Sequence, residues 1–410
     1  MFMAFAISIV GCSSDNDPVE DVMQGSDNKE AGVETRFLLT DAEKGAAAAT
    51  QGFGYDFFRA VSGCLPADEN VVVSPLSAQL LLSMTANATD AAATAEIASA
   101  LGCNDLDALN SLAEKCLTKL PAVEATTKLA LANSVWYADS HRLNPVFARS
   151  MTDFYAADNF ARDFTLGQPL VDEINGWCAD KTNGLVPKIL SNIPEGTEAI
   201  MANAMYFKGQ WANPFEDKET IDKTFHGSAI SSIVKMMHNE GMQHYAEGNG
   251  YEAVKMEMGN GAFAVTFVLP DAGKSIGDFI NGFDYAGLAS IEYRDITIDL
   301  SLPLCKLTSD DIDLEQALRS LGVNAIFNGG DFSLFTEKIA AKIKVNQKSA
   351  VEFNEQGAEG ASVTWNYMVT SNLDGGKVEI PVVTFNRPFL FFVNETSTGI
   401  CLMAGKFMNL

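Results

Sequence analysis

One stretch of the sequence, residues 352–376, combines the chemistry of a β-strand with the length of a loop. It reads EFNEQGAEGASVTWNYMVTSNLDGG, and after Gln356 it carries only two charges, on Glu359 and Asp374. A half-buried strand averages five or six residues, and a surface loop of this length usually has a function or is disordered. The segment therefore constrains the fold strongly, because the surrounding architecture must accommodate it both as a loop and as a strand.

The composition describes a folded globular chain without a surface for nucleic acid. The chain has 410 residues, of which 47% are hydrophobic and 20% are charged, and its formal net charge is −25. These fractions are ordinary for a globular protein, and the length alone allows two or three domains. Binding to phosphates requires clustered lysine and arginine residues, and the sequence contains no basic run. We therefore expect no nucleic-acid partner.

The N-terminus has the features of an export signal. The sequence MFMAFAISIVGCSS begins with about ten apolar residues, too few to span a bilayer and about the length of the apolar core of a signal peptide. Ile9-Val-Gly-Cys12 resembles the lipobox of bacterial lipoproteins, in which the cysteine is lipidated and becomes the mature N-terminus. We expect residues 1–11 to be a lipoprotein signal peptide and residues 12–39 to be a flexible tether. The resemblance implies an exported protein anchored by lipid in the outer membrane or at the cell surface, or an extracellular protein.

The other cysteines predict neither a disulfide framework nor a metal site. They are scattered along the chain, without a C-x-x-C pair and without a histidine at ligand spacing, at Cys64, Cys103, Cys116, Cys178, Cys305 and Cys401. In a domain of this size such cysteines are typically free buried thiols. We expect no metal and no cofactor.

The order of the predicted elements indicates an α+β fold. Thr40-Asp-Ala-Glu43 is a capping box that opens a helix, the alanine-rich stretch 76–101 is helical in character, and further helices are predicted near 145–156, 169–181 and 312–321. Strands are predicted at Leu129–Tyr137, Ala199–Phe207, Tyr251–Met258, Ala262–Leu269, Ile296–Leu302, Lys338–Val345, Ala350–Phe353, Val378–Phe385 and Phe389–Val393. The strands cluster without regular βαβ alternation, which favours a large mixed or antiparallel main sheet with additional β-sheets and surrounding helices. We expect one domain over residues 40–410.

Motifs that imitate those of enzymes fail on spacing or order. Gly273-Lys-Ser275-Ile-Gly277 imitates a nucleophile elbow, but three residues separate it from the preceding strand, and all four histidines precede Ser275. In that hydrolase class the histidine follows the serine. A phosphate-binding loop would need glycine where Val268 stands. The glycine pairs near residues 248 and 259 lead into strands and predict hairpin turns. We therefore expect a protein that is not an enzyme.

Several motifs in the correct order resemble those of the serpins, a family of serine protease inhibitors. Phe385-Asn-Arg-Pro-Phe-Leu-Phe391 resembles the family signature, and Gly405-Lys-Phe407 resembles its C-terminal strand. Further matches lie upstream, at Asn70–Ser77, Asn175 with Thr182-Asn-Gly184, Asn203–Trp211 and Thr266–Pro270. The resemblance covers residues 45–410 and implies the serpin fold and a monomer.

The resemblance also assigns the opening stretch a function. Residues 355–380 would be the reactive-centre loop, which a protease cleaves as if it were a substrate. Its hinge side would then insert as a new central strand of the main sheet, a strand addition that releases stored strain. The implied hinge comprises Glu355, Gly357, Ala358, Glu359, Gly360, Ala361 and Ser362. The inserted strand would trap the protease as a covalent acyl-enzyme.

The alternation along the loop suits such an insertion. Side chains of a strand point to opposite faces in turn. If Ala358 points inward, the inward set is Ala358, Gly360, Ser362, Thr364, Asn366, Met368 and Thr370, none of which is charged. The outward set is then Glu359, Ala361, Val363, Trp365, Tyr367 and Val369, which holds both large aromatics. The alternative is a serpin that no longer inhibits and serves as a surface binding, carrier or chaperone protein. Such members often carry charge, bulk or proline in the hinge, so the pattern favours an inhibitor.

The resemblance implies a second group of residues that controls opening of the sheet. These are Ser74, Ser77, Asn203, Gln347 and Trp211. Gln347 occupies the position where many serpins place a histidine that hydrogen-bonds the residue matching Asn203. A glutamine can likewise donate and accept hydrogen bonds.

Two counts along the loop place the cleaved bond differently. Counting from the hinge glutamate, as in the family, gives Ser371–Asn372, whereas counting back from the C-terminal signature gives the neighbourhood of Lys377. The hinge count is preferred, because six extra residues would add about 20 Å of slack to the inserted strand. Cleavage after Ser371, or after Thr370, suits an elastase-like or subtilisin-like serine protease. Tyr367 or Met368 would suit a chymotrypsin-like or papain-like enzyme, and Lys377 a trypsin-like one.

Overall fold

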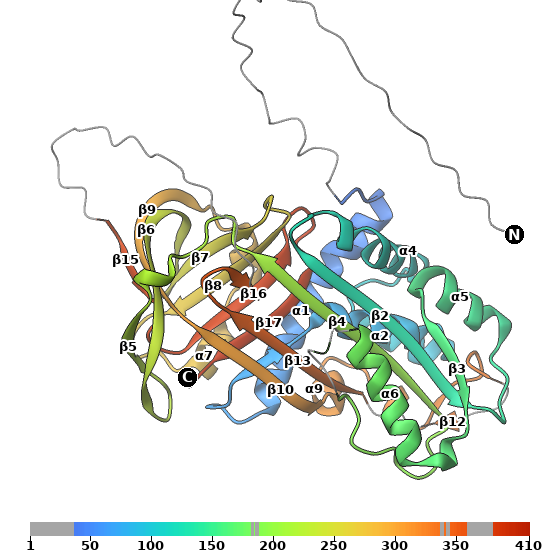
Figure 1. The fold of residues 1–410 in the computed structure, drawn as a ribbon. Helices are drawn as coiled ribbons and strands as arrows, with labels where there is room; N and C mark the ends of the chain where they lie inside the picture. The colour runs from blue at the N-terminus through green and yellow to red at the C-terminus, as the bar shows by residue number, and fades with distance from the viewer. Residues whose placement is uncertain (1–36, 182–183, 185–187, 337–339, 342–344, 359–379) are drawn as a thin grey trace, which may run out of the picture. The chain divides into compact units, whose positions relative to one another are not determined.

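Helices of the chain begin where local sequence satisfies their free backbone N–H groups. The computed structural model describes residues 37–181, 184, 188–336, 340–341, 345–358 and 380–410 (Figure 1). Its α-helices are α1 Asp41–Cys64, α2 Pro75–Ala86, α3 Ala91–Ala100, α4 Leu106–Thr118, α5 Pro145–Tyr155, α6 Gln168–Lys181, α7 Ile276–Gly282, α8 Tyr285–Ser290 and α9 Glu315–Ser320. The predicted capping box of α1 is confirmed, since Thr40 N–H donates to Glu43 Oε2 (2.7 Å) and Glu43 N–H to Thr40 Oγ1 (3.3 Å). The alanine-rich stretch contains two helices, because Asp90 caps a new one.

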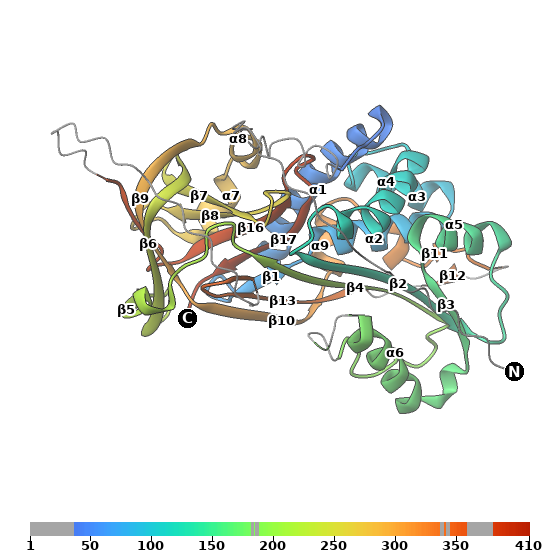
Figure 2. The same cartoon turned by 45° about the horizontal axis from the view of Figure 1, so that its top comes forward.

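One sheet carries the strands on which the functional argument depends. In the order of hydrogen bonding it contains β14 (Gly357–Ala358), β4 (Ala199–Gln210), β2 (Lys128–Ala138) and β3 (Asp158–Arg162). β2 runs antiparallel to β4, with Asn133 opposite Asn203, and parallel to β3. Figure 2 shows α6 on one face of these strands and α2, α4 and α5 on the other face.

The two faces of β4 belong to different apolar cores. Phe207 is buried in the main core, and the partly buried Met201 and Met205 pack against that core. Ala202 and Ala204 belong instead to a second cluster with Trp136 of β2 and Leu170, Ile174, Trp177 and Cys178 of α6. Alternate residues of a strand face opposite sides. The odd-numbered positions of β4 therefore face the main core, and the even-numbered positions face α6.

A separate antiparallel pair lies beside this sheet. It consists of β10 (Cys305–Asp313) and β13 (Asn346–Phe353), with Cys305 opposite Phe353. Among the described strands, β13 pairs with β10 but not with β4. On that side, the described residues that pair with β4 are the two of β14. The sequence predicted separate strands over 338–345 and 350–353. The structure instead has β12 (Ala340–Ala341), paired with β11 (Gly330–Asp331), and one longer strand β13.

The largest sheet is mixed. Its hydrogen-bonded order is β1 (Val71–Val73), β17 (Cys401–Phe407), β16 (Phe389–Glu395), β8 (Phe263–Pro270), β7 (Tyr251–Met258), β6 (Ser231–Gly248), β9 (Arg294–Pro303) and β15 (Val382–Thr384), and β5 (Ile221–His226) pairs with β6. β15 runs parallel to β9, whereas the other neighbours are antiparallel. The predicted α+β fold with a large mixed sheet is confirmed.

Aromatic side chains explain why the C-terminal motif has its particular residues. Phe389 and Phe407 stack with ring centroids 5.0 Å apart, and Phe391 meets Phe353 of β13 edge to face at 5.2 Å. All four rings are almost completely buried. Each such burial stabilises the fold by roughly 1.5–3 kcal/mol, so the motif anchors β13 against the largest sheet.

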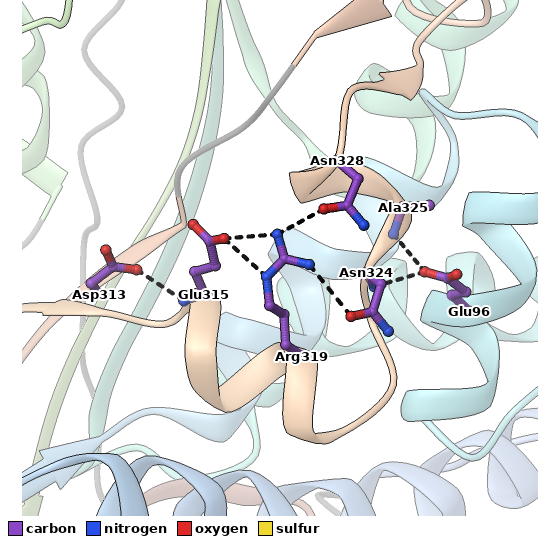
Figure 3. Close-up of polar contacts among 7 residues, drawn as sticks. All are labelled: Glu96, Asp313, Glu315, Arg319, Asn324, Ala325 and Asn328. Carbon is purple, nitrogen blue, oxygen red and sulfur yellow. Dashed lines mark hydrogen bonds and ion pairs between the residues drawn. The ribbon is translucent and has the colours of Figure 1, made fainter.

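A polar cluster fixes the segment that leads from α9 toward β11 (Figure 3). Arg319 donates from Nε to Glu315 Oε1 (2.9 Å) and from Nη2 to Asn328 Oδ1 (3.0 Å). Glu96 of α3 accepts from the backbone N–H groups of Asn324 and the next residue, each at 2.7 Å. The cluster therefore ties the segment after α9 to α3.

Of the six cysteines that the structure describes, four are buried: Cys116, Cys178, Cys305 and Cys401. None of the helices in the described ranges has the length and apolarity needed to cross a bilayer.

Candidate functional site

The predicted hinge begins as a tight reversal at the end of β13. Asn354 and Gly357 pair across the turn, with Asn354 N–H donating to Gly357 C=O (2.8 Å) and Gly357 N–H to Asn354 C=O (3.2 Å). The Asn354 side chain supports the turn, because its Oδ1 accepts from the N–H groups of Gln356 (3.0 Å) and Gly357 (3.1 Å). Asparagine commonly stabilises turns in this way. The chain leaving β13 is thus already turned back on itself.

The reversed chain has already entered the sheet by two residues. Gly357 pairs with Gln210 and Ala358 pairs with Gly209, so β14 extends β4 in the antiparallel sense. The sequence interpretation described a loop that inserts after cleavage. The structure places the first residues of the hinge at the sheet in the uncleaved chain.

The segment that follows β4 fastens this turn. Trp211 N–H donates to Gln356 C=O (2.9 Å), and Phe215 N–H donates to Glu355 C=O (2.8 Å). The buried indole of Trp211 donates from Nε1 to Asn354 C=O (2.9 Å). Thr220 Oγ1 donates to Glu355 Oε1 (2.8 Å). The structure therefore brings the predicted residues Trp211, Glu355 and Gly357 together, and it adds Thr220 as a partner that the sequence did not identify.

Gly357 is the residue type that its position requires. Its φ is +146°, in a region that side-chain-bearing residues rarely adopt. A Cβ atom at this position would lie 2.7 Å from Gln210 Cα and closer still to the Gly209 carbonyl oxygen. The close approach of two backbones thus depends on the absence of a side chain.

A second polar group consists of Ser74, Ser77 and Gln347. Ser74 Oγ donates to Leu402 C=O (2.8 Å) and lies 2.9 Å from Ser77 Oγ, a hydroxyl that can donate to it in turn. The Gln347 side chain brackets the backbone of Ser74: its Oε1 accepts from Ser74 N–H (2.9 Å), and its Nε2 donates to Ser74 C=O (2.8 Å). This pair of bonds ties β13 to the start of α2.

Asn203 has different partners from those that the resemblance implied. Its Nδ2 donates to Asn133 Oδ1 (2.8 Å), and Asn133 Nδ2 donates to Tyr155 C=O at the end of α5 (2.8 Å). No hydrogen bond joins it to Gln347, because both polar ends of that amide bond the Ser74 backbone. The buried Asn203 Oδ1 has no hydrogen-bond partner within the described part of the chain. Leaving a buried acceptor unsatisfied costs about 1–3 kcal/mol.

The remaining predicted site residues lie outside the described residues. They are Cys12, the hinge positions Glu359, Gly360, Ala361 and Ser362, and the candidate cleavage positions Tyr367, Met368, Thr370, Ser371, Asn372 and Lys377. The enzyme-like motifs have structural roles instead. Ser275 caps α7, where its Oγ accepts from Asp278 N–H (3.4 Å), and Gly250 and Gly261 occupy tight turns with positive φ.

These features define a protein that holds the start of a new strand beside β4, the strand to which no other described strand pairs on that side. Unpaired strand edges accept additional strands readily. The family model of the serpins (serine protease inhibitors) matches residues 48–410, and the chain belongs to this family.

Similar proteins come from distant organisms. Serpin-ZX of Arabidopsis thaliana is 28% identical over 367 residues, which cover 83% of this chain and 92% of the plant protein. Serine protease inhibitor 42Dd of Drosophila melanogaster is 28% identical over 344 residues, covering 81% and 89% of the two chains. The native-state structure of tengpin, a thermophilic serpin, matches with a TM-score of 0.79 at 26% identity and covers 91% of this chain and 95% of its own. Family membership supports protease inhibition in general, and serpins are in general inhibitors that bind proteases rather than enzymes.

Proposed function

We propose that this chain is a suicide-substrate inhibitor that traps serine proteases by inserting its cleaved loop beside β4, with papain-like cysteine proteases as a second candidate class of target. The observation that carries the proposal is β14, in which Gly357 and Ala358 already pair with the end of β4. Beyond these two residues, no other described strand pairs with this edge of β4. The turn and the register of a new strand are therefore set before any protease acts.

The register of β14 with β4 predicts which loop residues would pair with which residues of β4 on insertion. Each step forward along the loop corresponds to one step back along β4, so residues 357–368 would pair with the whole of Ala199–Gln210. Thr364 would then lie opposite Asn203. Its hydroxyl is a hydrogen-bond donor, and Asn203 Oδ1 is a buried acceptor without a partner in the described residues. Insertion would thus supply the missing hydrogen bond.

Trapping requires that covalent bonds form and break in a specific order. The protease nucleophile attacks the carbonyl carbon of Ser371, an acyl bond to the protease forms, and the amine of Asn372 leaves with a proton from the protease's general acid. The acyl bond then travels with the inserting strand. If insertion precedes hydrolysis, the protease stays attached. We propose Ser371–Asn372 as the bond, with Tyr367, Met368, Thr370 and Lys377 as alternatives, and an elastase-like or subtilisin-like enzyme as the target.

A protease panel tests this function. The full chain is incubated with elastase-like, subtilisin-like, chymotrypsin-like, trypsin-like and papain-like enzymes, and the products are separated on a denaturing gel. We expect a covalent band with at least one elastase-like or subtilisin-like enzyme, and the mass of the released C-terminal peptide identifies the bond. Cleavage by every active enzyme without a covalent band would instead support a non-inhibitory carrier or chaperone.

We also propose that the inhibitor is an exported lipoprotein anchored through Cys12. The support is the apolar N-terminus that ends in Ile9-Val-Gly-Cys12, followed by a polar and acidic segment. In a bacterial host, Cys12→Ser should move the protein from the membrane fraction to the soluble fraction. A variant that fractionates like the unaltered protein would contradict the anchor.

A further inference from the structure

Several separate segments of the chain enclose a cavity of about 450 Å³. Its lining comes from the connection between α1 and β1, the turn between β5 and β6, the segment from β8 to α7, and the residues that precede β16 and follow β17. Two sequence motifs meet in it, Gly273-Lys-Ser275-Ile-Gly277 and Arg387-Pro388. We propose that this cavity, which we call the Arg387 cavity, binds a small organic carboxylate with an apolar body. The proposal is independent of protease inhibition and of any movement of the loop.

Arg387 supplies the cation that such a ligand requires. Its Nε donates to Pro270 C=O (3.1 Å), which fixes the orientation of the planar guanidinium. Within the described part of the chain, this is the only hydrogen bond or ion pair of its side chain. The two Nη groups can therefore donate to both oxygens of a carboxylate, the bidentate geometry that a guanidinium favours.

The nearby acidic side chains leave Arg387 available. Glu252 and Asp271 both attract its charge. Glu252, however, already accepts from Tyr245 OH (3.0 Å), and Asp271 pairs with Lys274 Nζ at 3.9 Å. Burial outweighs the two attractions and lowers the pKa of Arg387, because the guanidinium is partly removed from water. An opposite charge attracts such a partly desolvated cation more strongly than an exposed one.

Backbone hydrogen bonds hold the walls of the Arg387 cavity in place. Ser228 N–H donates to Met408 C=O (2.9 Å), and His226 N–H donates to Asn386 C=O (2.7 Å). The turn between β5 and β6 is thereby tied both to the C-terminal residues and to the residue before Arg387. Small-molecule sites are usually preformed clefts of roughly 300–1,000 Å³, and this cavity meets both criteria.

The lining favours a single carboxylate on an apolar body over a multiply charged anion. The buried lining residues Pro270, Ile276 and Met408 are all apolar. The exposed lining residues include Asp68 and Asp271, and the whole chain carries a net charge of −25. These negative charges oppose a dianion such as phosphate, whereas a monoanion meets less repulsion and gains from burial of its apolar part.

Calorimetric titration of the full chain tests the ligand class. The probes are hexanoate and benzoate, with hexanamide, acetate and inorganic phosphate as comparisons at constant ionic strength. We expect saturable binding of one hexanoate or benzoate per chain. Hexanamide lacks the charge and acetate lacks the body, so each should bind at least about tenfold more weakly. Absence of saturable binding by both carboxylates, or equal binding of hexanamide or phosphate, overturns the proposal.

A pair of charge-matched variants tests the role of Arg387. Arg387→Gln should weaken hexanoate binding at least about tenfold. Arg149→Gln removes the same charge from an exposed position on α5, which does not line the cavity, and should bind hexanoate like the unaltered protein. If the two variants bind hexanoate equally well, Arg387 does not hold the carboxylate.

A measurement on the unaltered protein locates the ligand even if Arg387→Gln does not fold. The full chain is labelled with ¹³C in the methyl groups of isoleucine and methionine, and Ile276→Val and Met408→Leu assign the two signals of the cavity. Hexanoate should shift the signals of Ile276 and Met408 and leave that of Met151, which is buried in the main core, unchanged. Saturable binding that shifts neither signal of the cavity would place the carboxylate elsewhere and overturn the proposal.

Discussion

Replacing Gly357 by alanine should detach the hinge from the sheet and turn the inhibitor into a substrate. The φ of +146° places this residue in a region that alanine rarely adopts. The new Cβ would also lie 3.0 Å from the carbonyl carbon of Gly209 and 2.7 Å from Gln210 Cα. Both contacts are with backbone atoms of β4, so no side-chain rotation can relieve them. The pairing of β14 with β4 must give way.

The expected size of the effect follows from these contacts. Forcing a side-chain-bearing residue into a left-handed conformation costs about 1–2 kcal/mol, and each backbone hydrogen bond lost removes about 0.5–1.5 kcal/mol. Together they disfavour the docked hinge by about 2–4 kcal/mol. Every 1.36 kcal/mol is tenfold, so docking weakens by about 30-fold to several hundred-fold. The intact fold is spared, because the hinge undocks instead of straining the sheet.

The assay measures how the acyl-enzyme divides between trapping and release. Hydrolysis of the acyl bond depends on the protease and is unchanged, whereas insertion that starts from the docked hinge is slowed. We expect Gly357→Ala to consume more than ten times as many inhibitor molecules per trapped protease, with the same bond cut and an unchanged melting temperature before cleavage. The control is Gly360→Ala, the same glycine-to-alanine change three residues further along the hinge. If Gly357→Ala traps protease as well as the control does, docking of β14 is not a step of insertion.

Three further substitutions test other parts of the structure. Ala358→Arg should abolish trapping, because the register directs an unpaired guanidinium into the main core at a cost of several kcal/mol. Glu359→Gln, on the other face of the strand, should trap protease nearly normally. If the two variants trap protease equally well, the register is wrong. Burial would raise the pKa of Glu124, but hydrogen bonds from Thr126 and its neighbour outweigh it and lower that pKa. This carboxylate therefore contributes stability that is present above its unfolded pKa of about 4.3 and is lost as the pH falls through the lower folded value. Urea unfolding should show Glu124→Gln to be less stable than the unaltered protein at pH 7 by about 1 kcal/mol, with the gap closing toward pH 3; a gap independent of pH would contradict the assignment. Arg319→Ala should lower the free energy of unfolding by about 1–3 kcal/mol, since it removes the centre of the cluster in Figure 3; an unchanged calorimetric midpoint would show that the cluster is not stabilising.

Elements with strong local signals were predictable from the sequence, and polar strands were not. β2, β4, β7 and β8 are rich in apolar residues, and the sequence predicted each to within a few residues. β6 escaped prediction, because its central residues include an asparagine, a glutamate and a glycine, which are depleted in strands. Its pairing with β7 and β9 on either side supplies what local preference lacks.

The same limit applies to the hinge. Glycine and alanine have little strand preference, and the donors that hold the turn, Trp211 and Phe215, are some 140 residues away in sequence. Sequence alternation could therefore indicate that this segment is suited to a sheet, but not that two of its residues already occupy one. Asn133 was also missed as a partner of Asn203. A lone asparagine within a predicted apolar strand was the available signal.

The three-residue strand β15 explains why a docked hinge does not simply continue inserting in the uncleaved chain. Full pairing along β4 would carry residue 368 about 40 Å from the hinge, at 3.3 Å per residue. Residues 369–381, thirteen in number, would then have to return over that distance and still reach Val382, which is paired with Asp299 of β9. Thirteen residues span at most about 45 Å when fully extended. The uncleaved chain would thus have to be pulled almost straight or release β15 from β9, and cleavage of the loop removes this constraint at once. β15 is held by a parallel pairing of only three residues. The equilibrium of the uncleaved chain between the state with the loop outside the sheet and the state with the loop inserted therefore depends on the strength of that pairing as much as on the hinge.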